Sequence, residues 1–299
     1  MNTLITGGSG LVGSCLESKF KPSSKDLNLF NLQDIINYIQ TNNIDRIVHC
    51  AAKVGGIKAN SDYLGDFFYD NIRINTNVLE AARLCRLSKV VSFMSSCVFP
   101  TDANYPLTTD QLHSGEPHPT NYAYAYAKRM LEVQSRAYRD QHGCNFVTVI
   151  PCNIYGPNDN FNLESSHVIP ALIHKCYLAK QNNTDFEVWG TGKAYREFVY
   201  SEDVGYITQW VLENYDDPDP VIISPDQEIS IATIAQEISW RMGFEGNIIF
   251  NQERDGILKK PSDNSKLKSL LPNYAFVPIE VGLVKTIEWF IENYEKARK

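Results

Sequence analysis

A glycine triplet near the start of the chain constrains the fold more than any other feature. The motif Gly7-Gly-Ser-Gly-Leu-Val-Gly13 follows a short apolar segment at residues 2–6, and residues 11–20 read as a helix. Glycine permits a tight turn and lets backbone amides approach a pyrophosphate, which then lies at the positive end of the helix. Because strand, glycine turn and helix occur in this order, we predict a dinucleotide site here rather than a merely structural turn.

Strand-like and helix-like segments alternate through the first half of the chain. The predicted strands lie at residues 46–50, 89–94 and 145–150, and the predicted helices between them include residues 32–40 and 71–87. Such alternation predicts an α/β fold with a Rossmann-type, doubly wound parallel sheet that binds ligands at the carboxyl ends of its strands. No clear second strand follows Phe20, and the pattern is less regular beyond residue 157.

The composition of this 299-residue chain restricts the kinds of partner that it can bind. A formal charge of -7 without a polybasic run argues against a nucleic-acid partner, because a phosphate backbone calls for a basic face. Seven cysteines, never spaced as Cys-x-x-Cys, indicate a reduced protein with neither a disulfide framework nor a metal site. We see no charged leader and no apolar run long enough to span a bilayer, so we predict a cytoplasmic protein without a membrane partner.

Tyr124 and Lys128 form the second chemical feature. They lie four residues apart, and good helix formers follow at residues 129–138, so the two side chains should share one helical face. An ammonium beside a phenol favours the phenolate, so Lys128 is expected to lower the pKa of Tyr124 and let it exchange a proton near neutral pH. A chance pair, with a packed tyrosine and a solvated lysine, is the alternative for this motif taken alone.

The segment after Phe20 bears on the choice of cofactor. Ser23, Ser24 and Lys25 stand where an NAD-selective enzyme often has a carboxylate for the ribose hydroxyls. This composition favours the 2'-phosphorylated cofactor, NADP. Asp26 is expected either to touch the adenine or to begin a turn.

Other motifs extend the pattern nearly end to end. They are Ala51-Ala-Lys-Val-Gly-Gly56, Ser95-Ser-Cys-Val-Phe-Pro100, Asn153-Ile-Tyr-Gly-Pro-Asn-Asp-Asn-Phe161, Ser166-His-Val-Ile-Pro170, Val188-Trp-Gly-Thr-Gly192 and Arg196-Glu-Phe198. With these motifs the chain resembles the extended short-chain dehydrogenase/reductases that act on nucleotide sugars. Within that family it is most similar to the GDP-L-fucose synthases, which combine a 3,5-epimerase with an NADPH-dependent 4-reductase.

The resemblance implies a role for particular residues. Tyr124, Lys128 and Ser95 would form the reductase triad, and Cys97 and His167 the epimerising pair. The NADP-binding set would comprise Gly7, Ser9, Gly10, Leu11, Val12, Gly13, Asp26, Ala51, Ala52, Ser95, Tyr124, Lys128, Pro151, Asn153, Ile154 and His167. The nucleotide sugar would be held by Lys175, Trp189, Arg196 and Asp255, with Lys175 in place of the arginine expected in bacterial members.

It also implies how the chain is divided. Residues 1–155, with part of 195–225, would form the NADP-binding Rossmann domain. Residues 156–194 and 226–299 would form a smaller C-terminal α/β substrate-binding domain. A homodimer would pair the helices at residues 71–87 and 124–141 across a two-fold axis.

The implied substrate, GDP-4-keto-6-deoxy-D-mannose, has acidic hydrogens at C3 and C5 because its ketone can take up charge as an enolate. Cys97 and His167 suit the base and acid of an epimerisation, while Tyr124 and Ser95 would hold the oxygen where charge develops. An unperturbed thiol has a pKa near ~8.5, so Cys97 needs a local positive field or a hydrogen bond to act as a base. Reduction at C4 would follow, with Tyr124 protonating the new alkoxide, to give GDP-L-fucose.

Three other functions remain open from the sequence. The closest is an epimerase/reductase that acts on another nucleotide-linked 4-keto-6-deoxy sugar, since its catalytic residues would be the same. A nucleotide-sugar 4-epimerase has no need of Cys97 and His167. A non-catalytic cofactor-binding sensor would be expected to have lost Tyr124 or Lys128.

Overall fold

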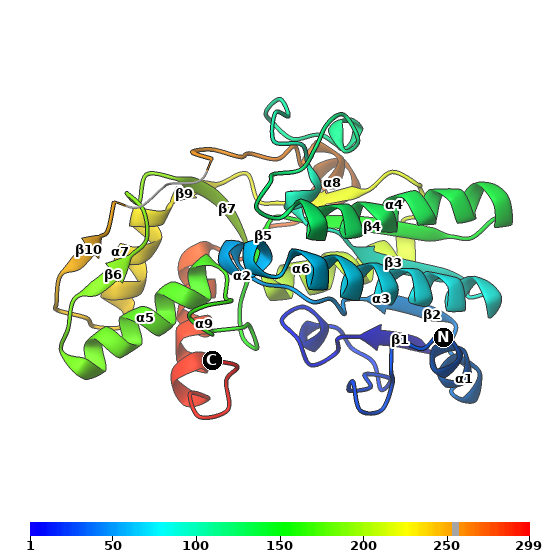
Figure 1. Cartoon of the computed structure of the whole chain (residues 1–299), viewed down its shortest axis with the longest axis horizontal. Coiled ribbons are helices and arrows are strands. Elements are labelled where there is room, and N and C mark those ends of the chain that lie inside the picture. Colours follow the sequence, from blue (N-terminus) through cyan, green and yellow to red (C-terminus); the bar gives the residue numbers. More distant parts are fainter. Residues whose placement is uncertain (253–256) are drawn as a thin grey trace.

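The computed structural model describes residues 1–252 and 257–299, so Asp255 lies outside the described residues. A five-stranded sheet forms the centre of one part of the molecule (Figure 1). Its strand order is β1 (Thr3–Thr6), β2 (Arg46–His49), β3 (Lys89–Phe93), β4 (Phe146–Pro151) and β8 (Val221–Ile223), and all neighbours are parallel. The predicted parallel sheet is confirmed.

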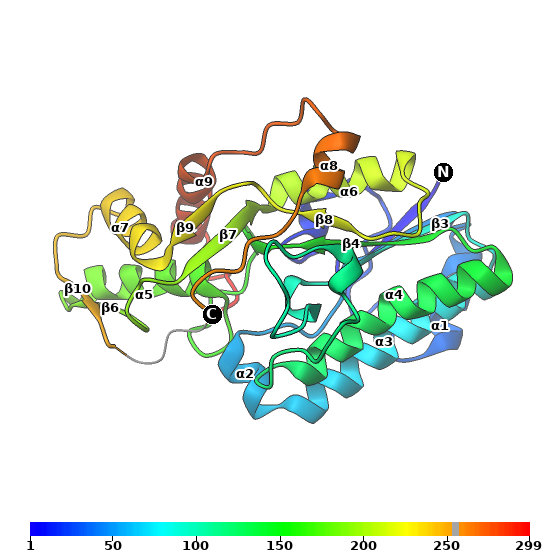
Figure 2. The same ribbon diagram turned by 90° about the horizontal axis from the view of Figure 1, so that it is seen from above.

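Helices cover both faces of this sheet, as Figure 2 shows. One layer contains α1 (Leu32–Thr41), α3 (Leu64–Leu84) and α4 (Tyr122–His142), and the other contains α6 (Ser201–Asn214) and the short α8 (Ser265–Leu270). Consecutive strand residues alternate between the two cores: Leu4 packs with the α1, α3 and α4 layer, whereas Ile5 packs with α6. Strands β3 and β4 are buried at every position, as expected for a sheet covered on both sides.

The helix predicted at residues 11–20 is wrong. Only a three-residue 3-10 turn, η1 (Gly13–Cys15), follows the glycine motif, and Leu16 is already extended. Phe20 then forms a parallel bridge with Leu4, and its carbonyl accepts a hydrogen bond from the Ile5 amide at 2.9 Å. Since the chain must reach the edge of β1 within a few residues of Leu16, it has no length left for a full helix.

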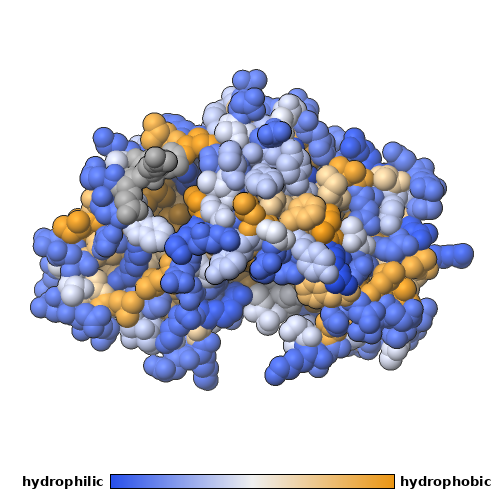
Figure 3. Space-filling model, in the orientation of Figure 1, coloured by the Kyte–Doolittle hydropathy of each residue, from blue (hydrophilic) through white to orange (hydrophobic). Residues whose placement is uncertain are grey.

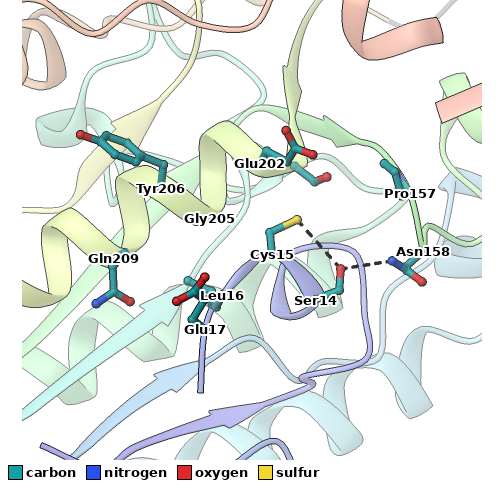
Figure 4. A pocket seen from close by; sticks show the side chains of 11 residues that line it. Ser14, Cys15, Leu16, Glu17, Pro157, Asn158, Glu202, Gly205, Tyr206 and Gln209 are labelled. Carbon is teal, nitrogen blue, oxygen red and sulfur yellow. Dashed lines mark hydrogen bonds between the residues drawn. The ribbon is translucent and has the colours of Figure 1, made fainter. Parts of the chain in front are cut away.

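A cavity of about 710 Å³ lies between η1 and α6 (Figure 4). Figure 4 shows Ser14 and Cys15 on the η1 side and Glu202, Tyr206 and Gln209 on the α6 side. Gly205 allows the closest approach, because a Cβ there would lie 2.8 Å from the Cβ of Cys15. Because only a short turn follows the glycine motif, no helix at residues 11–20 packs over this part of α6.

The second half of the chain builds two smaller sheets. One contains β5 (Asn153–Tyr155), β7 (Tyr195–Tyr200) and β9 (Glu228–Ser230), and the other pairs β6 (Phe186–Val188) with β10 (Ile248–Phe250). Helices α5 (Val168–Asn182), α7 (Ile231–Arg241) and α9 (Ile279–Glu292) pack on them around a core that contains Phe161, Phe186 and Phe290. This part of the molecule is also α/β, as predicted.

The remaining elements are short. They are α2 (Ile57–Asp62), η2 (Ser96–Val98) and η3 (Thr109–Gln111). In the part of the chain that the structure describes, every helix is too short or too polar to serve as a membrane span.

Gly282 lets α9 pack on two buried tyrosines. A Cβ at this position would lie 2.8 Å from Cζ of Tyr155 and 3.0 Å from Cδ2 of Tyr200, and both rings are almost fully buried. We predict that Gly282→Ala lowers the free energy of unfolding by about 1–3 kcal/mol, because the added methyl overpacks this contact. Urea unfolding followed by circular dichroism measures the change.

Gly65 provides the matched control. It lies in α3, and a Cβ there would meet no atom within 4 Å. Gly65→Ala should therefore raise the free energy of unfolding by about 0.5–1 kcal/mol through helix propensity alone. Equal effects of the two substitutions would contradict the packing role of Gly282.

Candidate functional site

A cavity of about 320 Å³ opens at the carboxyl ends of β1, β2, β3 and β4. It brings together most of the residues predicted to bind NADP. The predicted residues in its lining are Gly7, Ser9, Gly10, Leu11, Val12, Gly13, Ala51, Ala52, Ser95, Tyr124, Lys128, Pro151, Asn153, Ile154 and His167. Segments that are far apart in the sequence meet here because parallel strands end at the same edge of a sheet.

The glycine motif forms the floor of this cavity. Gly7 adopts a φ of +68°, and a Cβ on Gly13 would lie 2.8 Å from the Cα of Gly8. These positions require glycine, and the turn between them presents backbone amides to a ligand. The sequence predicted that the positive end of a long helix would face the ligand here. Because η1 has only three residues, no helix dipole points at this loop.

A second cavity of about 480 Å³ adjoins the first and shares Gly7, Ser9, Ala51 and Ala52 with it. Ser23 and Ser24 line this second cavity, but Lys25 and Asp26 do not. The carboxylate of Asp26 accepts hydrogen bonds from the Ser23 amide at 3.1 Å and the Ser23 hydroxyl at 2.6 Å, which hold its pKa below the usual range. Asp26 thus closes the turn at residues 23–26.

Tyr124 and Lys128 are both buried on the same face of α4, as their spacing predicts. The Lys128 ammonium donates a hydrogen bond to the Phe93 carbonyl at 2.9 Å and lies 5.9 Å from the centre of the Tyr124 ring. Burial lowers the pKa of Lys128 to about 8. The alternative of a solvated lysine is therefore wrong.

The expected lowering of the Tyr124 pKa is also wrong. Burial raises this pKa well above its ordinary value, and the neighbouring Cys97 raises it further. Desolvation disfavours the charged phenolate. Tyr124 is therefore a neutral phenol at physiological pH, which is the state of a proton donor.

A buried chain of hydrogen bonds holds α4 against the sheet. His49 Nε2 lies 3.1 Å from Asn75 Oδ1, and Asn75 Nδ2 donates to the Ala127 carbonyl at 3.0 Å. Because Oδ1 can only accept, the imidazole donates from Nε2 and accepts at Nδ1 from Thr6 Oγ1, at 2.8 Å. Burial lowers the pKa of His49 to about 3, so the ring is neutral as this arrangement requires.

Ser95 and Cys97 follow β3 in one short segment. The Ser95 side chain caps η2 by accepting a hydrogen bond from the Cys97 amide at 3.5 Å. Ser95 lines the main cavity, whereas Cys97, two residues further along the chain, is half-buried and is not among the residues that line it. Burial raises the pKa of the Cys97 thiol, and the Ser95 hydroxyl and the ammonium groups of Lys260 and Lys128 oppose that shift.

His167 enters the cavity from the second half of the chain. It is the residue before α5 (Val168–Asn182), and its side chain makes no capping hydrogen bond there. It lines the cavity together with Tyr124 and Ser95, and desolvation by the surrounding walls lowers its pKa. The imidazole is therefore neutral and able to exchange a proton.

Lys175, Trp189 and Arg196, which were predicted to hold the nucleotide sugar, lie outside the lining of this cavity. The Lys175 ammonium lies 4.1 Å from the centre of the Trp189 ring, which is half exposed. Arg196 donates hydrogen bonds to the carbonyls of Tyr195 and Ile257 at 2.6 and 2.7 Å.

Two charged residues that line the cavity were not predicted from the sequence. Asp159 is buried, accepts a hydrogen bond from the Asn160 amide at 2.7 Å, and leaves Oδ2 without a partner. Burial raises the pKa of Asp159 to about 7. Arg298 lines the same cavity and donates to the Asn158 carbonyl at 2.7 Å. Asp159 stands inside a motif already noted, but only its burial distinguishes it there.

The cavity can hold a dinucleotide beside the neutral phenol of Tyr124 and the neutral imidazole of His167. Among residues 1–252 and 257–299, no three His, Cys, Asp or Glu side chains are grouped so that they could hold a metal ion. The side chains that the structure describes can therefore transfer protons next to a bound cofactor.

Comparison with known proteins agrees with this geometry. Residues 3–224 match the model of the NAD dependent epimerase/dehydratase family. The chain is 44% identical to GDP-L-fucose synthase of Dictyostelium discoideum, over 99% of this chain and 97% of the relative. It is 41% identical to a probable GDP-L-fucose synthase of Drosophila melanogaster, over 99% of both chains.

A solved structure shares the whole fold. The GDP-L-fucose synthetase of Naegleria fowleri, bound to NADP, superposes with a TM-score of 0.94 at 39% identity, covering 99% of this chain and 94% of that one. The chain belongs to the NAD-dependent epimerase/dehydratase family and, within it, to the GDP-L-fucose synthases.

Proposed function

We propose that this protein converts GDP-4-keto-6-deoxy-D-mannose into GDP-L-fucose, by epimerisation at C3 and C5 and NADPH-dependent reduction at C4. The observation that carries the proposal is the convergence of Ser95, Tyr124, Lys128 and His167 on one cavity, with the Cys97 amide bonded to the Ser95 side chain. Relatives of matching length bear the name of this activity.

The two adjoining cavities fit NADP. The glycine turn offers amides to the pyrophosphate, the cavity with Ser23 and Ser24 suits the adenosine end, and residues 151–154 with Lys128 suit the nicotinamide end. NADPH supplies a hydride when it is bound. Lys128, fixed by the Phe93 carbonyl, is positioned to bind the adjacent ribose.

Epimerisation requires proton exchange at the carbons beside the ketone. Cys97 takes the proton as a thiolate, and the electron pair of the C–H bond moves into the enolate, whose oxygen receives hydrogen bonds from Tyr124 and Ser95. A second group returns a proton on the opposite face. His167, the residue before α5, lines the cavity and suits that role.

Reduction then produces an alkoxide at C4. Tyr124 protonates this oxygen, and the raised pKa of Tyr124 keeps its proton available until that charge develops. Lys128 next to it stabilises the transient phenolate. Burial thus suits Tyr124 to act as an acid.

The nucleotide portion of the substrate is assigned to the second half of the chain. We propose that Trp189 stacks on the guanine and that Arg196 and Lys175 bind the diphosphate, in keeping with the pairing of Lys175 and Trp189. The role proposed for Asp255 falls outside the described residues. Residues 1–155 with part of 195–225 would serve the cofactor, and residues 156–194 and 226–299 the sugar nucleotide.

We further propose a cytoplasmic protein. Seven free thiols suit a reducing compartment. Cell fractionation that found the protein in a secretory compartment would refute this assignment.

The substrate assay tests the proposed function directly. Incubation with GDP-4-keto-6-deoxy-D-mannose and NADPH should oxidise the cofactor and release GDP-L-fucose, measured by absorbance at the nicotinamide band and by mass spectrometry with NMR. NADH in place of NADPH is the control for cofactor choice. Turnover with only a UDP- or dTDP-linked keto sugar would instead support the alternative substrate class.

The two chemical steps should separate by mutation. Cys97→Ser is expected to slow solvent-deuterium exchange at C3 and C5 at least about tenfold, because a hydroxyl is a far weaker base than a thiolate. Tyr124→Phe should mainly abolish cofactor oxidation, since it removes the proton donor for C4. NMR of the recovered sugar nucleotide measures the exchange, and equal effects of both variants would overturn this division of roles.

A homodimer should form through α3 and α4. Figure 3 shows patches of hydrophobic side chains among hydrophilic ones where these helices run. The exposed apolar residues include Phe68 and Tyr69 of α3 and Tyr122 of α4. We expect sedimentation equilibrium to give a dimer and the double variant Phe68→Glu, Tyr69→Glu to give a monomer, because buried carboxylates oppose association. An unchanged dimer in the variant would place the interface elsewhere.

A further inference from the structure

A lysine from near the end of the chain reaches the segment that carries Cys97. The Lys260 ammonium donates a hydrogen bond to the Ser96 carbonyl at 2.8 Å, across 164 positions of sequence. Ser96 lies between Ser95 and Cys97 at the start of η2. A positive charge is therefore fixed one residue away from the thiol.

The segment around Lys260 is held on both sides. The Pro261 carbonyl accepts a hydrogen bond from the Leu107 amide at 2.9 Å, and the Asp263 amide donates to the Leu107 carbonyl at 2.9 Å. The buried carboxylate of Glu197 accepts the Ser262 amide at 3.1 and 3.2 Å. The position of Lys260 is thus set by the backbone of residues 261–263.

The titratable groups that face Cys97 come from two other elements. Lys128, Tyr124 and Arg129 of α4 each interact electrostatically with the thiol, and Lys260 does so from the opposite segment. Lys260 opposes the raised pKa of Cys97 more strongly than Lys128 does. The two ammonium groups differ in where they are bound: Lys128 donates to the Phe93 carbonyl at the end of β3, whereas Lys260 donates to the carbonyl of Ser96, the residue next to Cys97.

We propose that Lys260 stabilises the thiolate of Cys97 and so makes that thiol an effective base for epimerisation. The inference rests on the proposed role of Cys97. In the step itself the thiolate takes the proton from C3 or C5, and the electron pair of the broken C–H bond passes to the enolate oxygen. Lys260 keeps its proton throughout and acts through Cys97, without touching the reacting carbons.

Lys260→Gln tests this inference, because glutamine can still donate a hydrogen bond to the Ser96 carbonyl but carries no charge. The rate of Cys97 alkylation by iodoacetamide, followed by peptide mass spectrometry from pH 6 to 10 without substrate, reports the thiolate directly. We expect alkylation near pH 7 to slow roughly tenfold and the pH profile to move to higher pH. Lys260→Arg should restore most of the rate.

Lys259→Gln is the matched control. Its ammonium lies 4.8 Å from the centre of the exposed Tyr195 ring and takes no part in the site, so this variant should alkylate like the wild type. Lys260→Met, which keeps the aliphatic stem, replaces Lys260→Gln if circular dichroism shows that the glutamine variant does not fold. An unchanged profile in the uncharged variant refutes the inference.

Catalysis supplies an independent readout. In Lys260→Gln, the kcat for deuterium exchange at C3 and C5 should fall, and the increase of this kcat with pH should shift to higher pH. A rise in KM alone would instead identify Lys260 as a substrate-binding residue and overturn the proposal. If Cys97→Ser leaves deuterium exchange at C3 and C5 unchanged, the proposed function of Cys97 is refuted. The pH profile of Cys97 alkylation then still decides whether Lys260 stabilises the thiolate.

Discussion

The buried hydrogen bonds from Thr6 through His49 and Asn75 to the Ala127 carbonyl connect the central sheet to one of its two helix layers. They join β1 and β2 to α3 and α4, and they end one residue before Lys128. A neutral imidazole with one donor and one acceptor fits this chain, and its burial prevents protonation from breaking it. The position of the reductive pair on α4 thus depends on a polar contact inside the core rather than on the helix alone.

Burial also determines the electrostatic state of the site. Desolvation keeps Tyr124 and His167 neutral and lowers the pKa of Lys128 to about 8. The cavity therefore places a neutral phenol and a neutral imidazole where an enolate or an alkoxide would form. Interactions of this kind favour the transition state over the ground state, because the charge they stabilise exists only during the reaction.

Short-range patterns predicted much of this molecule. The alternation of strands and helices gave the parallel sheet, the glycine spacing gave the cavity floor, and four-residue spacing gave the shared face of Tyr124 and Lys128. Features that depend on contacts between distant segments could not be predicted from the sequence. The bridge between Leu4 and Phe20 replaced the expected helix, and burial reversed the expected pKa shift of Tyr124. Lys260 reaches Ser96 only because the chain returns to the first sheet late in its course.

The chain also returns to the first sheet earlier, at β8, and this return has a consequence for how the protein is made. Strand β8 (Val221–Ile223) completes the first sheet beside β4, after the chain has already built α5 and β6 in the other half. On the ribosome, the edge of β4 stays unpaired until some seventy further residues have emerged. No single cut of the gene can therefore yield two self-sufficient halves, and a nascent chain halted before β8 would expose an open, apolar strand edge of the kind that chaperones protect.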